Sequence, residues 1–241
     1  MVRRLMPGIF RFYAGSNPVE AAALTIEAAL RDAVSERGRA SLMVSGGRSP
    51  KSLYATLSKA KLDWSKISIS LVDERWVNPG EAGSNEDFIK GNLIQNAASQ
   101  AKFVGLKTPH DSVVKGLSAA QARLTEFADP FDVCVLGMGS DGHTASWFPN
   151  SKGLAAALSS ENPNKLCYVD ATGCEGAGAH TDRITLTLNA VLDARKLILF
   201  IPGEEKRNVF HAAAEKKYFD APVQALTQSG EKLHIYASSA T

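Results

Sequence analysis

The stretch that decides the fold is LMVSGGRSPKSLYATLSKA, residues 42–60. Its first four residues are mostly apolar, which is typical of a buried strand. Two glycines follow, and Ser49 and Pro50 are then interpreted as the N-cap and first residue of a helix over residues 50–60. A strand, a tight loop and a helix in this order form the unit from which α/β folds are built.

The same alternation continues on both sides of this unit. Strands are predicted over residues 9–13, 67–72, 132–136, 166–169, 184–188, 197–201 and 233–236. Helices are predicted from Pro18 to a stop at Gly38, from Ser84 onward, over the segment ARLTEFA behind a capping box of Ser118 and Gln121, and over residues 204–214. We therefore expect an α/β fold with a largely parallel sheet, helices on both faces, and a site outside the carboxyl ends of the strands.

Composition limits the classes of function. The 241 residues are 44% hydrophobic and 22% charged, which predicts one folded domain over residues 1–241. Basic and acidic residues nearly balance, 27 against 25, so nucleic acid is not an expected partner. No apolar run approaches the ~20 residues of a membrane span, and the first residues do not resemble a secretory signal. Three cysteines, an odd number, favour a reducing compartment, and we expect a cytoplasmic protein.

The loop VSGGRSP, residues 44–50, is a candidate anion site. Gly46 and Gly47 let the backbone turn closely, and the free N–H groups at the start of the next helix attract phosphate. The loop lacks the GK[ST] ending of a P-loop. An ordinary tight turn remains the alternative.

The segment VDERWV, residues 72–77, places ionisable residues directly after a predicted buried strand. Asp73 and Arg75 at such a position can orient a sugar and hold its phosphate. A structural ion pair between them is the alternative.

The segment VLGMGSDGHTASWFP, residues 135–149, satisfies GxGxxG after a strand. A dinucleotide site is nevertheless disfavoured, because Pro149 stops any helix after His143 and no acidic strand end follows at the usual distance. Histidine titrates near pH 6.5 and suits general-base work, and Asp141 beside it can fix its tautomer. We therefore interpret His143 as a catalytic base, against the ordinary role of a surface or core histidine.

Two further strand ends carry cations. Arg183 precedes the strand ITLTL, and Lys206 lies in the first turn of a predicted helix. The helix dipole disfavours a lysine there unless an anion compensates, although a solvated lysine is equally compatible. Between the third and fourth segments, residues 171–180 are rich in glycine and predict a mobile surface loop, with a position at the border of the site as the alternative.

Several chemistries find no support in the sequence. It contains no GxSxG, no HExxH and no CxxC, so we expect neither a nucleophilic serine nor a metal, and no cofactor. A histidine, an acid, several cations and glycine turns are suited to activating water against an electrophilic carbonyl.

In their order, SGGRSP, DERWV followed by GSNED, GMGSDGHTASWFP, RITLT and PGEEK resemble the 6-phosphogluconolactonase family. The resemblance implies a Rossmann-like α/β fold, shared with amino-sugar-phosphate deaminases and sugar-phosphate isomerases. It also implies hydrolysis of 6-phosphoglucono-1,5-lactone to 6-phosphogluconate in the pentose phosphate pathway. We expect a small phosphosugar lactone as the partner and a monomer, with a weak dimer as the alternative.

The resemblance also implies roles for individual residues. His143 corresponds to the general base, with Asp141 as its partner. The substrate- and phosphate-binding residues implied are Ser45, Gly46, Gly47, Arg48, Asp73, Arg75, Arg183 and Lys206. Two features depart from the family pattern: Arg48 stands where a small hydroxyl residue is frequent, and a glycine-rich segment precedes Arg183 in place of a proline-rich one.

Two rival functions remain open at this point. An amino-sugar-phosphate deaminase or isomerase of the same fold would release ammonia or interconvert sugars, but residues 144–148, TASWF, favour the lactonase branch. A non-catalytic sugar-phosphate sensor would bind the ligand without turnover.

Overall fold

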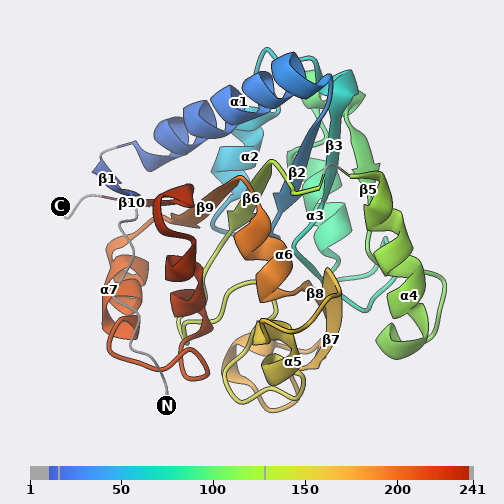
Figure 1. Ribbon diagram of the computed structural model, residues 1–241, viewed down its shortest axis with the longest axis vertical. Coiled ribbons are helices and arrows are strands. Elements are labelled where there is room, and N and C mark those ends of the chain that lie inside the picture. Colours follow the sequence, from blue (N-terminus) through green and yellow to red (C-terminus); the bar gives the residue numbers. More distant parts are fainter. Residues whose placement is uncertain (1–10, 16, 128, 239–241) are drawn as a thin grey trace.

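The computed structural model describes residues 11–15, 17–127 and 129–238 (Figure 1). A seven-stranded sheet in the order β1-β10-β9-β6-β2-β3-β5 runs through the molecule, and all its neighbouring strands are parallel. Its strands are β1 (Arg11–Gly15), β2 (Ala40–Val44), β3 (Ile67–Leu71), β5 (Lys102–Val104), β6 (Val133–Leu136), β9 (Lys196–Ile201) and β10 (Leu233–Ser238). The predicted largely parallel sheet is confirmed. Residues 9 and 10 of the predicted first strand lie outside the described residues, and residues 11–13 belong to β1.

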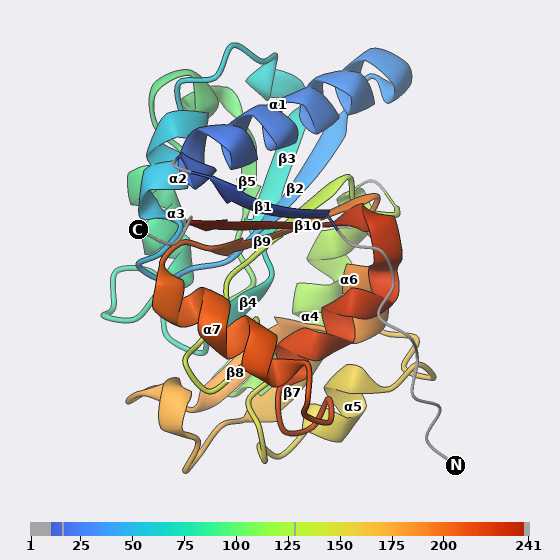
Figure 2. The ribbon, with the colours of Figure 1, turned by 90° about the vertical axis from the view of Figure 1, so that its left-hand side faces the viewer.

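Helices cover both faces of this sheet. Seen edge-on in Figure 2, the strands β9 and β10 lie between α1 (Pro18–Arg37) and α7 (Glu204–Ala213). The other helices are α2 (Lys51–Leu57), α3 (Asn85–Asn92), α4 (Val113–Arg123), α5 (Leu154–Leu158) and α6 (Leu188–Asp193). Turns of 3-10 helix are formed by Trp64–Lys66, Asn96–Gln100, Leu124–Glu126, Glu175–Ala177 and Pro222–Lys232.

Local signals set the ends of the long helix α1. The Asn17 side chain accepts a hydrogen bond from the backbone N–H of Glu20 at 3.1 Å, which satisfies one of the free donors of the first turn. At the other end Gly38 has a φ of 70°, and its N–H donates to the carbonyl of Val34 at 2.9 Å. A residue without a side chain adopts this left-handed conformation at little cost, so the predicted stop at Gly38 is confirmed.

The direction of the chain reverses between β2 and β6. From β2 the chain proceeds to β3 and β5 on one side, and it then returns to place β6 on the other side of β2. The loops that leave the carboxyl ends of these two central strands therefore diverge and open a crevice between them. These loops are the sequence motifs SGGRSP and GMGSDGH.

A second, three-stranded antiparallel sheet was not predicted. It consists of β4 (Asp73–Arg75), β8 (Asp182–Leu186) and β7 (Leu166–Asp170) in the order β4-β8-β7. Residues 73–75, which follow the strand predicted over residues 67–72, thus form a strand of their own. The strands predicted over residues 166–169 and 184–188 belong to this sheet and not to the parallel one. Three successive charged residues carry no hydrophobic alternation, so the sequence gives no strand signal there.

Two predicted helix starts are wrong. Ser49 does not cap α2: Pro50 occupies the cap position without a side-chain hydrogen bond, and the Ser49 hydroxyl instead accepts a bond from Lys206 Nζ at 2.8 Å. The Ser49 hydroxyl oxygen, predicted to cap the helix, is therefore bonded to Lys206, a residue distant in the sequence.

The capping box of Ser118 and Gln121 is also wrong. Both residues lie inside α4, which begins at Val113 with Ser112 as its cap. Of the predicted helix ARLTEFA only the first two residues belong to α4, which ends at Arg123, and Leu124–Glu126 form a turn of 3-10 helix. The helix instead extends back through Gly116. A side chain at Gly116 would collide with Trp76 and Thr108, so this glycine serves close packing.

Candidate active site

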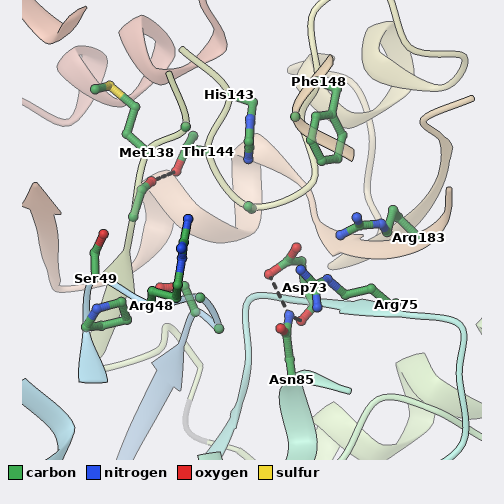
Figure 3. Close-up of a pocket in the computed structure, with 18 of the residues that line it drawn as sticks. Arg48, Ser49, Asp73, Arg75, Asn85, Met138, His143, Thr144, Phe148 and Arg183 are labelled. Carbon is green, nitrogen blue, oxygen red and sulfur yellow. Dashed lines mark hydrogen bonds between the residues drawn. The ribbon is translucent and has the colours of Figure 1, made fainter. Parts of the chain in front are cut away.

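The crevice at the carboxyl ends of β2 and β6 contains a pocket (Figure 3). The lining residues come from the loops after β2 and β6, from β4, β8, α3 and α7, and from the loop of residues 171–180. Every predicted binding residue lines it, together with His143: Ser45, Gly46, Gly47, Arg48, Asp73, Arg75, Arg183 and Lys206. Asp141 lies behind His143 and does not line the pocket.

His143 is held by a short turn that also holds its partner. Its Nδ1 lies 2.5 Å from Asp141 Oδ1, and its backbone N–H donates to the same oxygen at 3.1 Å. An ionised carboxylate only accepts hydrogen bonds, so Nδ1 carries the proton and Nε2 keeps its lone pair. Among the described residues no side chain or backbone group binds Nε2. The geometry therefore leaves His143 with a free basic nitrogen.

The charge state of Asp141 supports this arrangement. Burial on its own would raise the pKa of this carboxyl, but the hydrogen bonds and the charge interaction with His143 outweigh burial and hold the pKa below its ordinary value. Asp141 is consequently ionised throughout the neutral range. A carboxylate in this position stabilises the imidazolium that forms when histidine accepts a proton.

Glycines make room for this pair. A side chain at Gly139 would collide with the His143 ring and with Asp141, and so would one at Gly176. Gly142 has a φ of 83°, a conformation that suits glycine. No helix follows the turn directly, since the next helix is α5 at Leu154, which removes the structural context that a dinucleotide fingerprint requires.

The glycine-rich loop of residues 171–180 borders the pocket. Gly176 lines it, and Ala171 and Ala177 are buried against Phe148. Six of its ten residues are exposed, as expected of a surface loop, and Gly176 shows that the loop also borders the site. Its small residues let the loop backbone approach His143 closely. In the sequence these residues appear only as a run rich in glycine and alanine.

Arg183 and Arg75 face the pocket from paired strands. They are cross-strand partners in the antiparallel register of β4 and β8. Arg183 is buried, and its guanidinium donates to the carbonyls of Ala177 at 2.5 Å and His180 at 2.6 Å. Burial lowers the pKa of Arg183 to about 10, which leaves it cationic at neutral pH. Arg75 donates to the carbonyl of Gly83.

Asp73 is buried beside these cations, 6% exposed. Its carboxylate accepts a bond from Ser146 Oγ at 2.6 Å, and its backbone carbonyl accepts one from the Asn85 side chain at 2.9 Å. Among the described residues Asp73 forms no ion pair with Arg75. The alternative of a structural ion pair therefore finds no support, and the carboxylate remains available to the pocket.

The loop after β2 offers the other polar wall. Ser45 is 6% exposed, and its hydroxyl lies buried without a hydrogen-bond partner among the described residues. Such a hydroxyl can form a hydrogen bond to a ligand group that enters the pocket. Gly46 packs so closely on the Asn85 side chain that any Cβ there would collide with it. Tyr54 Oη of α2 donates to the Ser45 carbonyl at 2.7 Å and so holds this loop in place.

Lys206 and Arg48 complete the positive charge of the pocket. The ammonium of Lys206 donates to Ser49 Oγ at 2.8 Å and to the carbonyl of Met138 at 2.7 Å. Burial lowers the pKa of Lys206, Glu205 opposes the shift and the neighbouring Arg48 adds to it. Arg48 is exposed at the rim. In the view of Figure 3, Arg48 and Ser49 lie to the left, whereas Arg75 and Arg183 lie to the right.

Sequence reasoning missed several lining residues: Asn85, Thr144, Phe148 and Gly176. Asn85 and Thr144 lie within the quoted motifs GSNED and DGHTAS, but nothing in a polar residue's sequence neighbourhood shows that it faces a pocket.

Within the described residues no three His, Cys, Asp or Glu side chains come together as a metal ion would require. None of the described helices combines the length and hydropathy of a membrane span.

Fold and site together define an α/β protein with a cationic pocket that contains a histidine and its carboxylate partner. The chain belongs to the family described as glucosamine-6-phosphate isomerases/6-phosphogluconolactonase, whose model matches residues 15–235.

Similar proteins narrow this family. The chain is 39% identical over 219 residues to a 6-phosphogluconolactonase of Rhizobium meliloti, and this match covers 90% of this chain and 92% of the relative. It is 38% identical over 225 residues to the 6-phosphogluconolactonase of Pseudomonas aeruginosa, with 92% of each covered. The crystal structure of a 6-phosphogluconolactonase from Shewanella baltica is similar with a TM-score of 0.86 and 37% identity, over 97% of this chain and 98% of the other.

Proposed function

We propose that this protein is a 6-phosphogluconolactonase, which hydrolyses 6-phospho-D-glucono-1,5-lactone to 6-phospho-D-gluconate with His143 as the general base. The relatives that match most of the chain carry this name. The observation that carries the mechanism is the bond between His143 Nδ1 and Asp141, because it leaves Nε2 as a proton acceptor inside a cationic pocket.

The reaction proceeds in two steps. His143 Nε2 takes a proton from water while the water oxygen forms a bond to the lactone carbonyl carbon, and the carbonyl oxygen becomes an oxyanion. The oxyanion then collapses, the bond between the carbonyl carbon and the ring oxygen breaks, and the imidazolium returns its proton to that ring oxygen. General-base assistance contributes about 10²–10⁴-fold and an oxyanion donor about 10²–10³-fold.

The phosphate group does not react, so it serves to position the carbonyl. The β2 loop supplies the unpartnered Ser45 hydroxyl and glycine N–H groups, and Arg48 and Lys206 lie next to them. Together with Arg75 and Arg183 they provide the positive charge that a phosphate and a developing oxyanion need. Asp73 contacts sugar hydroxyls. Arg48 replaces a small hydroxyl residue of the family pattern and adds a bidentate donor at the rim.

The proposal includes the setting of the protein. It acts as a single-domain monomer in the cytoplasm, in the oxidative branch of the pentose phosphate pathway, without a metal or cofactor.

The test is hydrolysis of freshly generated 6-phosphogluconolactone, followed by acid release in a pH-stat and corrected for spontaneous opening. We expect His143→Ala to lower kcat about 10²–10⁴-fold. The matched control is His211→Ala, which removes an exposed histidine of α7 and should leave the rate unchanged. Wild-type turnover by His143→Ala would refute the proposed base.

A parallel assay separates the rival functions. Ammonia release from an amino-sugar phosphate, or sugar interconversion without acid release, would identify a deaminase or isomerase. Binding of 6-phosphogluconate without any turnover of the lactone would identify a sensor.

A further inference from the structure

We propose that Phe148 is a positioning residue for hydrolysis, whose ring fixes the plane of the His143 imidazole and the place of the Arg183 guanidinium. The inference rests on the proposed role of His143. It concerns a side chain that lines the pocket but offers no acid, base or hydrogen bond to a substrate.

Phe148 is set apart from the main core. It is 1% exposed, and its buried neighbours are Ala171 and Ala177, with Cys174 packed against them. All three neighbours belong to the loop of residues 171–180. The Cys174 thiol also donates to the carbonyl of Pro149 at 3.5 Å. The phenyl ring thus joins the segment that carries His143 to the loop that borders the pocket.

The ring also contacts the proposed base. The centroids of the Phe148 and His143 rings lie 4.3 Å apart, with 38° between their planes. The Nδ1 bond to Asp141 and the close approach of Gly139 and Gly176 hold the Nδ1 and Cε1 edge of the imidazole. The buried phenyl ring adds an aromatic contact that limits the tilt of the imidazole plane. Nε2 is then directed at one place in the pocket, as proton transfer from a bound water requires.

The same ring contacts a cation of the site. The central carbon of the Arg183 guanidinium lies 5.3 Å from the Phe148 centroid, within the range of a cation–π interaction (Figure 3). Arg183 already donates to two carbonyls of the 171–180 loop. The aromatic face gives this buried cation a third contact and fixes where it meets the substrate. One apolar side chain therefore sets the distance between base and cation.

The experiment replaces the ring by an aliphatic side chain in Phe148→Leu. The matched control is Phe131→Leu, because Phe131 is also buried, packs on Phe127 and lies under a cation, Lys165. Phe131 precedes the amino end of β6, whereas the pocket is at the carboxyl ends. A second variant, Phe148→Met, fills the site flexibly and serves if the leucine variant fails to fold.

Two readouts are measured on protein labelled at the histidine rings. The imidazole Cε1–H signal of His143, assigned by its loss in His143→Gln, reports the ring current of Phe148. Lactone hydrolysis gives kcat and KM per folded molecule. We expect Phe148→Leu to move the His143 signal and to lower kcat/KM at least tenfold, with neither change in Phe131→Leu.

The outcomes separate this inference from the proposed function. An unchanged His143 signal and a wild-type kcat/KM in Phe148→Leu would overturn the positioning role, even if His143→Ala is inactive. A moved signal with unchanged kcat/KM would overturn it too, since loss of the ring contact would then not matter to the reaction. If His143→Ala retains full activity, the proposed base fails, independently of the Phe148 result.

Discussion

The two sheets of this protein differ in what they bury. The central strands β2, β6 and β9 of the parallel sheet bury mainly aliphatic side chains, as the runs LMV, VCVL and LILFI show. The antiparallel sheet buries Asp73, Glu74 and Arg183 within two adjoining strands. Framework and buried charge are thus separated: the parallel sheet supplies most of the apolar core and directs its loops to one edge, and the antiparallel sheet supplies buried ionisable groups.

Buried charges need partners, and the small sheet provides them locally. Glu74 is fully buried and accepts backbone N–H bonds from Arg75 at 2.7 Å and from Asn85 and Glu86, each at 2.8 Å. These last two donors are the first residues of α3, so the carboxyl also caps that helix. Such groups are costly to bury without hydrogen bonds, which explains why they gather where loops and helix ends meet.

The largest effect is expected in the parallel sheet. Leu199 is fully buried in β9, and Leu199→Ala should lower the free energy of unfolding by about 2–5 kcal/mol because a cavity remains. Urea unfolding measures it, and KM should not change. Leu24→Ala, at a leucine of α1 that is 57% exposed, is the control and should cost little. A raised KM in Leu199→Ala would contradict the view that the core of the parallel sheet contributes to stability and not to substrate binding.

For a substitution in the antiparallel sheet we expect a loss of catalytic activity. Arg183→Ala removes a cation that lines the pocket, and kcat/KM should fall about 10²–10³-fold, the range for a lost donor to an oxyanion. Steady-state kinetics with the phosphorylated lactone measure the change. Arg31→Ala, at an arginine paired with Glu27 on the surface of α1, is the control. Unchanged kinetics in Arg183→Ala would show that the antiparallel sheet does not supply the positive charge that hydrolysis requires.

The smallest effect concerns pH. Burial raises the pKa of Glu74 to about 7 from an ordinary 4.5, although the three backbone donors oppose the shift. The folded protein then holds this proton more tightly than the unfolded chain does. The stability it contributes is complete below about pH 4.5 and is lost as pH rises through 7.

Comparison with Glu74→Gln isolates this contribution. The difference in free energy of unfolding between the wild type and the variant should decline by up to about 3 kcal/mol between pH 4.5 and 8. Urea unfolding at a series of pH values measures it. The exposed Glu36→Gln should show no such trend. A difference that is constant with pH would mean that Glu74 keeps its charge on folding.

Most strands and the longer helices around the parallel sheet were predictable because their signals are local, whereas the short strand β5 and the short helices α5 and α6 were not predicted. Apolar runs mark the strands, and residues such as Asn17, Gly38 and Ser84 mark helix ends by bonds to their own neighbours. The candidate base was predictable for the same reason, since Asp141 and His143 are two residues apart and share one turn. Where a distant partner intervened, as with Ser49 and Lys206, the local pattern misled.

From the sequence we could predict most of the strands and helices, the motifs that resemble one enzyme family, and the pairing of His143 with Asp141. Only the folded chain shows that Asp73 to Arg75 form a strand, that the loop of residues 171–180 reaches the histidine, and that Phe148 lies against both His143 and Arg183. The reason is physical. Periodicity and capping act between neighbours in the chain, whereas the contacts of a pocket join residues whose distance in the sequence carries no information about their distance in space.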